Sequence, residues 1–349
     1  MLDLNTATSY QEVGQTLCYE GGTMVSQPSL LVSLVCLVDK IPMPPAPPQG
    51  RGHPKVYPDR LFLKALVVMI LRRLHKVHEL LTVLEQPTPE MRTLRDCFLH
   101  NGQFPSRRTW DRRLKAIPAT LPAQIHCLGR RLVDLLQPWL QDGRAVAIDS
   151  TVLRARGGVW HKKDREKGIV PHTSIDTQAA WTKSGWHGWV YGWKLHLVGA
   201  VASIWIPLAA RLTPANVADK EIALLLIPEI PTETRFVLGD THYNDPDVRQ
   251  VCQAKNRILV ATRRGKYPHT DSGVEARRVF HKLRSGATEN FNEHFKSIFD
   301  ANGQVPTKGL VNTQRFVLGA VFVYQVGLFY RVEDLRNPCV GLKPFLRAA

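Results

Sequence analysis

The stretch that most constrains this fold is a short apolar run that ends in an acidic residue. Phe236, Val237 and Leu238 are too few and too β-prone for a helix, and they are typical of a buried strand in a parallel sheet. Gly239 breaks the run and Asp240 follows at once. Ligands of open α/β sheets bind beyond the carboxyl ends of strands, so this carboxylate is a candidate metal ligand or acid–base group. Considered alone, the stretch favours the simpler interpretation, an Asp that caps the next helix or starts a turn.

The same arrangement occurs earlier in the chain, which changes that balance. The apolar run 145–148 predicts a strand that ends at Asp149. The alternating segments 192–198 and 204–212 are expected to pair as antiparallel strands, followed by a turn and a helix from Asn216 to about residue 227. A helix over 246–255 and a strand over 258–261 follow Asp240. We therefore expect a sheet in which two neighbouring strands deliver Asp149 and Asp240 to one end.

A third acidic residue lies on a later helix, predicted over about 287–299, which follows a basic loop. This residue is Glu289. If the helix packs beside the same end of the sheet, three carboxylates meet there, and such a set can hold two Mg²⁺ ions, with Mn²⁺ as the alternative. Two ions of this kind promote phosphodiester chemistry.

The charge balance points to a polyanionic partner. Lys and Arg number 46 against 30 Asp and Glu, which gives a net charge of +16. Nucleic acid is the first candidate and an anionic membrane surface the second. The apolar segments 30–38 and 316–330 are too short to span a bilayer, and we interpret the second as a buried core helix. The six cysteines lie far apart in the sequence without a CxxC pair, as expected of reduced cytosolic thiols.

The front half of the chain is predicted to be helical. Residues 1–28 are expected to form a loose arm and the Pro-rich segment 41–54 an extended linker. Helices are predicted over 59–72, 77–84, 89–99, 106–115 and 121–140. The fourth has Ser106 as its N-cap, and Trp110 and Leu114 lie on one apolar side. Its cations, the candidate DNA contacts, are Arg107, Arg108, Arg112, Arg113 and Lys115. The segment resembles a helix-turn-helix, and the alternative is a solvated basic face.

These patterns predict four regions. They are a flexible arm with a Pro-rich linker (1–56), a helical DNA-binding domain (57–142), a catalytic domain (143–335) and a C-terminal tail (336–349). The Trp- and His-rich segment 154–188 is interpreted as a surface loop or hairpin of unassigned role. His196 alternates with Lys194 on a strand, which indicates a structural or phosphate-facing residue, since the histidines lack zinc-ligand spacing.

Three passages resemble DDE transposases of bacterial insertion sequences, which have a ribonuclease H-like catalytic domain. They are 147–151, 191–196 leading to 212–219, and 237–243, and the resemblance covers roughly 144–330, with the helical front half matching more loosely. It implies an α/β fold, a ribonuclease H-like mixed sheet flanked by helices and preceded by an all-helical N-terminal domain.

The resemblance also implies a role for the third acidic residue. Members of this family show the motif YxxRxxxExxxxxxK, and Glu289 and Lys296 have its E-to-K spacing. Ser285 stands at the arginine position, and Arg284 is one residue away. Glu293 fits worse, because Asp300 lies seven residues further on. In such proteins the motif Arg and Lys contact phosphates of the transposon end, which we carry over to Arg284 and Lys296.

The function implied is that of an insertion-sequence transposase. Such a protein binds the terminal inverted repeats of its element, cleaves the ends by two-metal catalysis at Asp149, Asp240 and Glu289, and transfers the 3′-OH to target DNA. The resemblance implies that Asp149 bridges both ions and that a homodimer forms on double-stranded DNA, without a membrane, in the bacterial cytoplasm at the nucleoid. Two alternatives stay open: an inactive or domesticated DNA-binding derivative, and a related nuclease that does not join strands.

Overall fold

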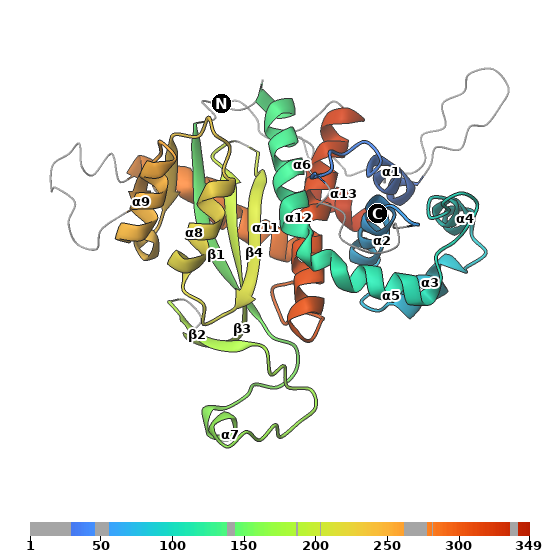
Figure 1. Cartoon of the computed structure of the whole chain (residues 1–349), viewed down its shortest axis with the longest axis horizontal. Coiled ribbons are helices and arrows are strands. Elements are labelled where there is room, and N and C mark those ends of the chain that lie inside the picture. Colours follow the sequence, from blue (N-terminus) through green and yellow to red (C-terminus); the bar gives the residue numbers. More distant parts are fainter. Residues whose placement is uncertain are drawn as a thin grey trace, which may run out of the picture.

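The computed structural model describes residues 29–45, 56–137, 144–185, 188–202, 204–261, 278–280, 282–335 and 341–349. The predicted N-terminal arm, most of the Pro-rich linker and most of the basic loop before Glu289 lie outside the described residues. The front half is helical as predicted (Figure 1). Its helices are α1 (Leu30–Leu37), α2 (Asp59–Leu71), α3 (Val77–Leu84), α4 (Pro89–Asp96), α5 (Arg107–Ala116) and α6 (Leu121–Leu136).

An aromatic cluster holds the helical region together. Trp110 of α5 is fully buried and lies edge-on to Phe62 of α2 and to Phe98, at centroid distances of 5.1 and 5.5 Å. Ser106 caps α5 as predicted, because its hydroxyl accepts a hydrogen bond from the Thr109 amide. The Sγ atoms of Cys36 and Cys97 lie 3.7 Å apart, a contact that their separation in the sequence did not indicate.

The second half of the chain is built on one mixed sheet. Its strands are β1 (Ala145–Arg154), β2 (Ala180–Ser184), β3 (Gly188–Ala200), β4 (Pro207–Pro214), β5 (Phe236–Gly239) and β6 (Ile258–Ala261). β1, β5 and β6 are parallel neighbours, and β3 pairs antiparallel with β1 on one side and with β2 and β4 on the other. This mixed sheet, flanked by helices and preceded by a helical region, is the α/β architecture that the sequence predicted.

Two local predictions about this sheet were wrong. β1 does not end at Ile148 but continues through Asp149 to Arg154, because it stays paired with β3 along its whole length. The helix α8 (Asp219–Leu226) begins three residues after Asn216, and its N-cap is Ala218 rather than Asn216.

Helix α12 (Leu310–Glu333) joins the helical region to the sheet. It packs on α2 and α6 of the helical region and on β4 of the sheet. The helical region, α12 and the sheet share one buried apolar cluster. Gln325, a polar residue in the apolar middle of this helix, is fully buried and donates hydrogen bonds of 2.8 Å to the carbonyl oxygens of Ile125 in α6 and Pro207 in β4. By length and hydropathy α12 could cross a membrane, but 83% of its most apolar 18-residue stretch is buried inside the fold, as expected of a core helix.

The remaining helices are α7 (Lys162–Glu166), α9 (Pro246–Ala254), α11 (Asn290–Ile298) and α13 (Leu342–Ala348). The predicted C-terminal tail contains α13, whose Leu342 and Leu346 are buried. Residues 155–179 project from the end of β1 as an arm that carries α7 (Figure 1). Hydrogen bonds between Gly157 and Gln304 and from the Gly309 amide to Asp176 fix its base.

Candidate active site

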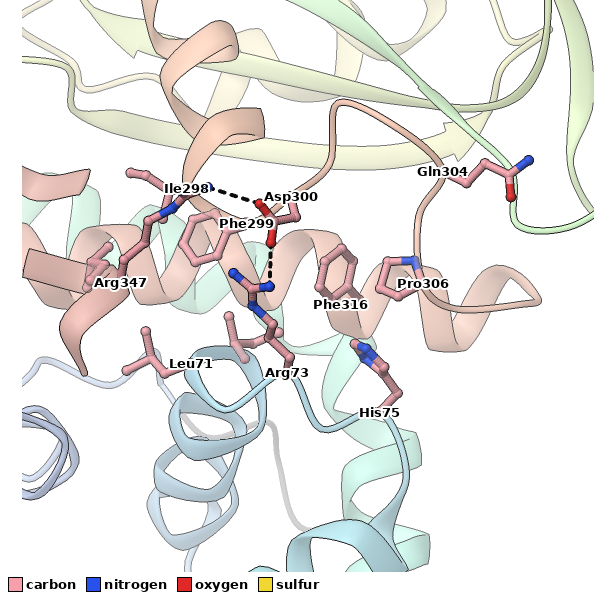
Figure 2. A pocket seen from close by; sticks show the side chains of 12 residues that line it. Leu71, Arg73, His75, Ile298, Phe299, Asp300, Gln304, Pro306, Phe316 and Arg347 are labelled. Carbon is pink, nitrogen blue, oxygen red and sulfur yellow. Dashed lines mark hydrogen bonds and ion pairs between the residues drawn. The ribbon is translucent and has the colours of Figure 1, made fainter. Parts of the chain in front are cut away.

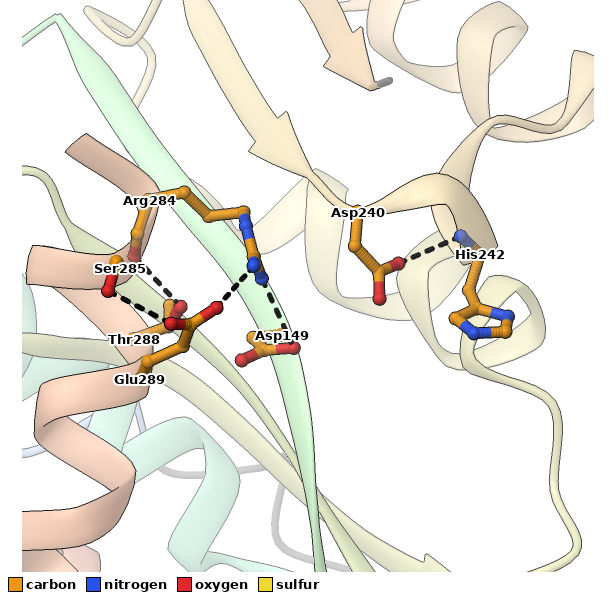
Figure 3. Close-up of polar contacts among 7 residues, drawn as sticks. All are labelled: Asp149, Asp240, His242, Arg284, Ser285, Thr288 and Glu289. Atoms are coloured by element: carbon orange, nitrogen blue, oxygen red, sulfur yellow. Dashed lines mark hydrogen bonds and ion pairs between the residues drawn. The ribbon is translucent and has the colours of Figure 1, made fainter. Parts of the chain in front are cut away.

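Two of the predicted carboxylates come from the parallel pair β1 and β5. Ala147 pairs with Leu238, so the side chains two residues further along each strand, Asp149 and Asp240, reach the same level of the sheet. Figure 3 shows Asp149 on β1 and Asp240 just beyond the end of β5. The sequence therefore predicted their convergence, although it placed Asp149 at a strand end rather than within a strand.

Asp240 also has the simpler role that the sequence left open. It caps the short 3₁₀ turn η4 (Thr241–Tyr243), and its Oδ1 accepts a hydrogen bond of 2.8 Å from the His242 amide. The cap fixes the carboxylate at the carboxyl end of β5, so capping and a site role are compatible.

The third carboxylate is delivered by a π-helical turn, η5 (Ser285–Glu289), which leads directly into α11. Glu289 closes this turn, and its side chain is 47% exposed. The Ser285 hydroxyl donates a hydrogen bond of 2.9 Å to its Oε2, and the Arg284 guanidinium forms an ion pair with its Oε1.

Arg284 occupies the space between the first and third carboxylates (Figure 3). Its Nη1 lies 3.9 Å from Asp149 Oδ1, and its Nη2 contacts Glu289. Within the described part of the chain, no three His, Cys, Asp or Glu side chains are close enough together to hold a metal ion. Two of the three predicted ligands, Asp149 and Glu289, thus hold a guanidinium between them, and Asp240 stands apart from it (Figure 3). The set nevertheless fits a divalent cation in its donor chemistry, since it offers carboxylates alone and an arginine already lies among them as a positive group.

The pKa of Asp149 reflects both its burial and the neighbouring negative charges. Its side chain is 15% exposed, and its pKa is raised to about 7, chiefly by burial and further by the charges of Asp240 and Glu289. Arg284 and a hydrogen bond from the Ser150 amide oppose this rise. Asp149 is therefore poised to release its proton when more positive charge arrives.

Lys296, the predicted phosphate contact on α11, also belongs to this site. Burial lowers the pKa of its ammonium group, and the charge of Asp149 opposes that shift. Asp149 thus interacts with charged groups from two other parts of the chain: Asp240 after β5, and Arg284, Glu289 and Lys296 in α11 and just before it.

Sequence reasoning missed a buried polar group behind the acidic residues. Asp219, in the first turn of α8, lies 3.2 Å from Lys194 Nζ and 3.4 Å from His196 Nδ1. His196 is 1% exposed and its Nε2 is 2.9 Å from Thr213 Oγ1. Burial lowers the pKa of His196 to about 4, so the ring is neutral and structural at neutral pH. Lys194 and His196 alternate on β3, and that spacing was the signal that they share a partner.

The predicted DNA-contact residues of α5 lie in the helical region, away from the acidic residues (Figure 1). Arg107, Arg108, Arg112 and Lys115 are exposed. Arg113 is different, because it forms an ion pair with Asp59 and its guanidinium stacks 4.5 Å above the Phe62 ring. Its structural contacts argue against the predicted DNA role.

A cavity of about 260 Å³ lies elsewhere, where the end of α2 meets α11, α12 and α13 (Figure 2). Its charged groups are paired with one another: Asp300 accepts from Arg73 at 2.6 Å and from Arg347 at 3.0 Å. The cavity holds none of the predicted site residues.

Comparison with protein families finds one match, to a transposase DDE domain over residues 140–285. This range includes Asp149 and Asp240 and ends four residues before Glu289. No curated protein gives a significant match. Among solved structures, the piggyBac transposase synaptic complex with hairpin DNA is similar at 10% identity and a TM-score of 0.38, over 91% of this chain and 76% of that one. A pre-cleavage Mos1 transpososome is similar at 11% identity and a TM-score of 0.22, over 80% of each chain.

Both structural similarities have TM-scores below 0.5 and carry no family assignment. Residues 140–285 of this chain match the family model of a transposase DDE domain.

Proposed function

We propose that this protein is an insertion-sequence transposase that cleaves the phosphodiester bonds at its element's ends and transfers the 3′-OH to target DNA. The observation that supports this most is the arrangement of acidic side chains. Asp149 on β1 lies within the influence of two further carboxylates, Asp240 and Glu289, and of two cations, Arg284 and Lys296. Two of the three acidic residues lie in the part of the chain that matches a transposase DDE domain.

In this proposal Asp149, Asp240 and Glu289 hold two divalent ions, Mg²⁺ or Mn²⁺. When bound, such ions activate the attacking oxygen and stabilise the leaving oxygen of a phosphodiester. The chain's own contribution is position and charge: the strands fix two carboxylates, α11 brings the third, and Lys296 and Arg284 face the DNA backbone. No nucleophilic side chain is needed, and Tyr243, which follows Asp240 by three residues, is fully buried with a pKa raised well above its ordinary value by that burial.

End recognition is assigned to the helical region. In this proposal the exposed cations of α5 contact phosphates, and their exposure and the net charge of +16 support it. Two ends have to be joined in one event, so we propose that a homodimer assembles on the DNA, in the bacterial cytoplasm.

The test is a pair of asparagine variants. Asp149→Asn should abolish cleavage of a labelled inverted-repeat end in Mg²⁺ yet bind that end with unchanged affinity. Asp247 is an exposed carboxylate in the first turn of α9, so Asp247→Asn is the matched control. It should both bind the end and cleave it. Cleavage that survives in Asp149→Asn would refute the assignment.

A second assay separates a transposase from a nuclease that does not join strands. Pre-cut ends with free 3′-OH groups are mixed with plasmid target and Mg²⁺. We expect joined product from the unaltered protein and none from Asp149→Asn. Hydrolysis of uncut ends without joined product would support the nuclease, and end binding without cleavage would support an inactive derivative.

A further inference from the structure

The spacing between Arg284 and Glu289 is one residue longer than the family motif, and the structure shows how the extra residue is accommodated. The motif places arginine four residues before the glutamate, whereas Arg284 lies five residues before Glu289. Between them the backbone forms the π turn, in which the Asn290 amide donates to the Ser285 carbonyl five residues back. A π turn accommodates one more residue than an α turn, so Arg284 and Glu289 face each other as residues four apart do in an α-helix.

The contacts of Arg284 are of a kind that another cation can replace. Its guanidinium is 13% exposed and interacts with the carboxylates of Asp149 and Glu289, while its Nε is buried without a hydrogen-bond partner. Arg257 offers a contrast: three backbone carbonyls, of Ile227, Ile230 and Pro231, accept from it at 2.6–3.1 Å. The carbonyl acceptors of Arg257 carry no net charge and attract a divalent cation weakly. The carboxylate acceptors of Arg284 are the ligands that such a cation prefers, so it can displace Arg284.

We propose that Arg284 is the resident cation of the acidic site, which holds Asp149 and Glu289 together in the metal-free protein and has to leave before divalent ions are bound. The guanidinium that is released then faces the DNA phosphates, so that one side chain serves both states in turn. This inference rests on the proposed function, because it takes the three carboxylates as the metal ligands. Arg284 is here a positioning residue, acting through the carboxylates it contacts.

The experiment measures Mn²⁺ binding to the full chain without DNA, by electron paramagnetic resonance of the free ion. Arg284→Gln removes the competing cation and should bind Mn²⁺ roughly tenfold more tightly, as expected when one partly screened ion pair no longer has to be broken. Arg284→Lys keeps the charge and should remain within a few-fold of the unaltered protein. Lys282→Gln removes an exposed cation two residues away and controls for the general change in charge. Unchanged or weaker binding by Arg284→Gln, or an equal gain in Lys282→Gln, would overturn the proposal.

Two further measurements keep the outcomes separate. Asp149→Asn should lose high-affinity Mn²⁺ binding. If it binds Mn²⁺ normally, the metal site of the proposed function is wrong; if it loses Mn²⁺ while Arg284→Gln gains nothing, only the role of Arg284 is wrong. Arg284→Met, which keeps the aliphatic part of the side chain, replaces Arg284→Gln if circular dichroism shows that the glutamine variant is unfolded, and it carries the same expectation.

Discussion

Replacing Asp149 with asparagine should stabilise the metal-free protein at alkaline pH even as it removes activity. The pKa of Asp149 is about 7 in the folded chain against an ordinary 3.8, mainly because of burial. At about 1.4 kcal/mol per pKa unit, a charged Asp149 costs the folded state roughly 4 kcal/mol at pH 8. Asparagine avoids that cost, and burial of its amide takes back part of the gain, so we expect a net stabilisation of about 2 kcal/mol.

The sign of the pH dependence follows from the direction of the shift. Because the folded state binds the proton more tightly than the unfolded state, this contribution to stability is complete below pH 4 and is lost as the pH rises towards 7. Urea unfolding in the presence of EDTA should therefore show the gain of Asp149→Asn at pH 8 and almost none at pH 4. Asp247→Asn should show no comparable gain at pH 8. An asparagine variant that is equally stable or less stable at pH 8 would refute the electrostatic account of this site. Added Mg²⁺ should stabilise the unaltered protein and not Asp149→Asn.

Three further predictions concern the helical region and the π turn. Arg112→Ala should lower the slope of log binding constant against log salt by about 0.9 without loss of stability, and an unchanged slope would mean that the basic face of α5 only meets solvent. Arg113→Ala should leave that slope unchanged and cost about 1 kcal/mol of unfolding free energy; a slope that falls as for Arg112→Ala would restore its DNA role. Deletion of Gly286 should give the four-residue spacing of the family and raise the unfolding free energy by about 0.5–1 kcal/mol, because a glycine leaves the helix. A clear loss of thermal stability in that variant would show that the π turn is required for packing.

The sequence predicted what depends on hydrophobic periodicity. Helices α2, α3 and α5 and the strands that carry Asp149 and Asp240 all follow from apolar spacing and caps. The extent of β1 could not be predicted in this way: the polar residues after Ile148 suggest a strand end, but pairing with β3 continues to Arg154. Tertiary pairing overrode the local pattern there.

The site residues that escaped prediction depend on contacts between distant parts of the chain. Arg113 has the same residue type as its neighbours on α5, and only the packing of α2 against α5 removes it from the surface. Arg284 stands one residue away from the motif position, which in the sequence looks like a mismatch. The π turn over Ser285–Glu289 explains it, and such a turn has no simple sequence pattern. Asp219 was expected only as a residue at the start of a helix, because its partners Lys194 and His196 lie on the distant strand β3.

The hydrogen bonds of Gln325 have a consequence for how DNA is accommodated. They tie α12 to both α6 and β4, within an apolar core that runs without interruption from the helical region to the sheet. If α5 contacts an element's end as proposed, each subunit presents its recognition helix and its carboxylates at a set separation. Wherever a straight double helix misses one of the two contacts, it has to curve to reach both, and sequences with easily kinked steps between them gain an advantage. Selection of ends would thus depend on the stiffness of base pairs that no side chain touches.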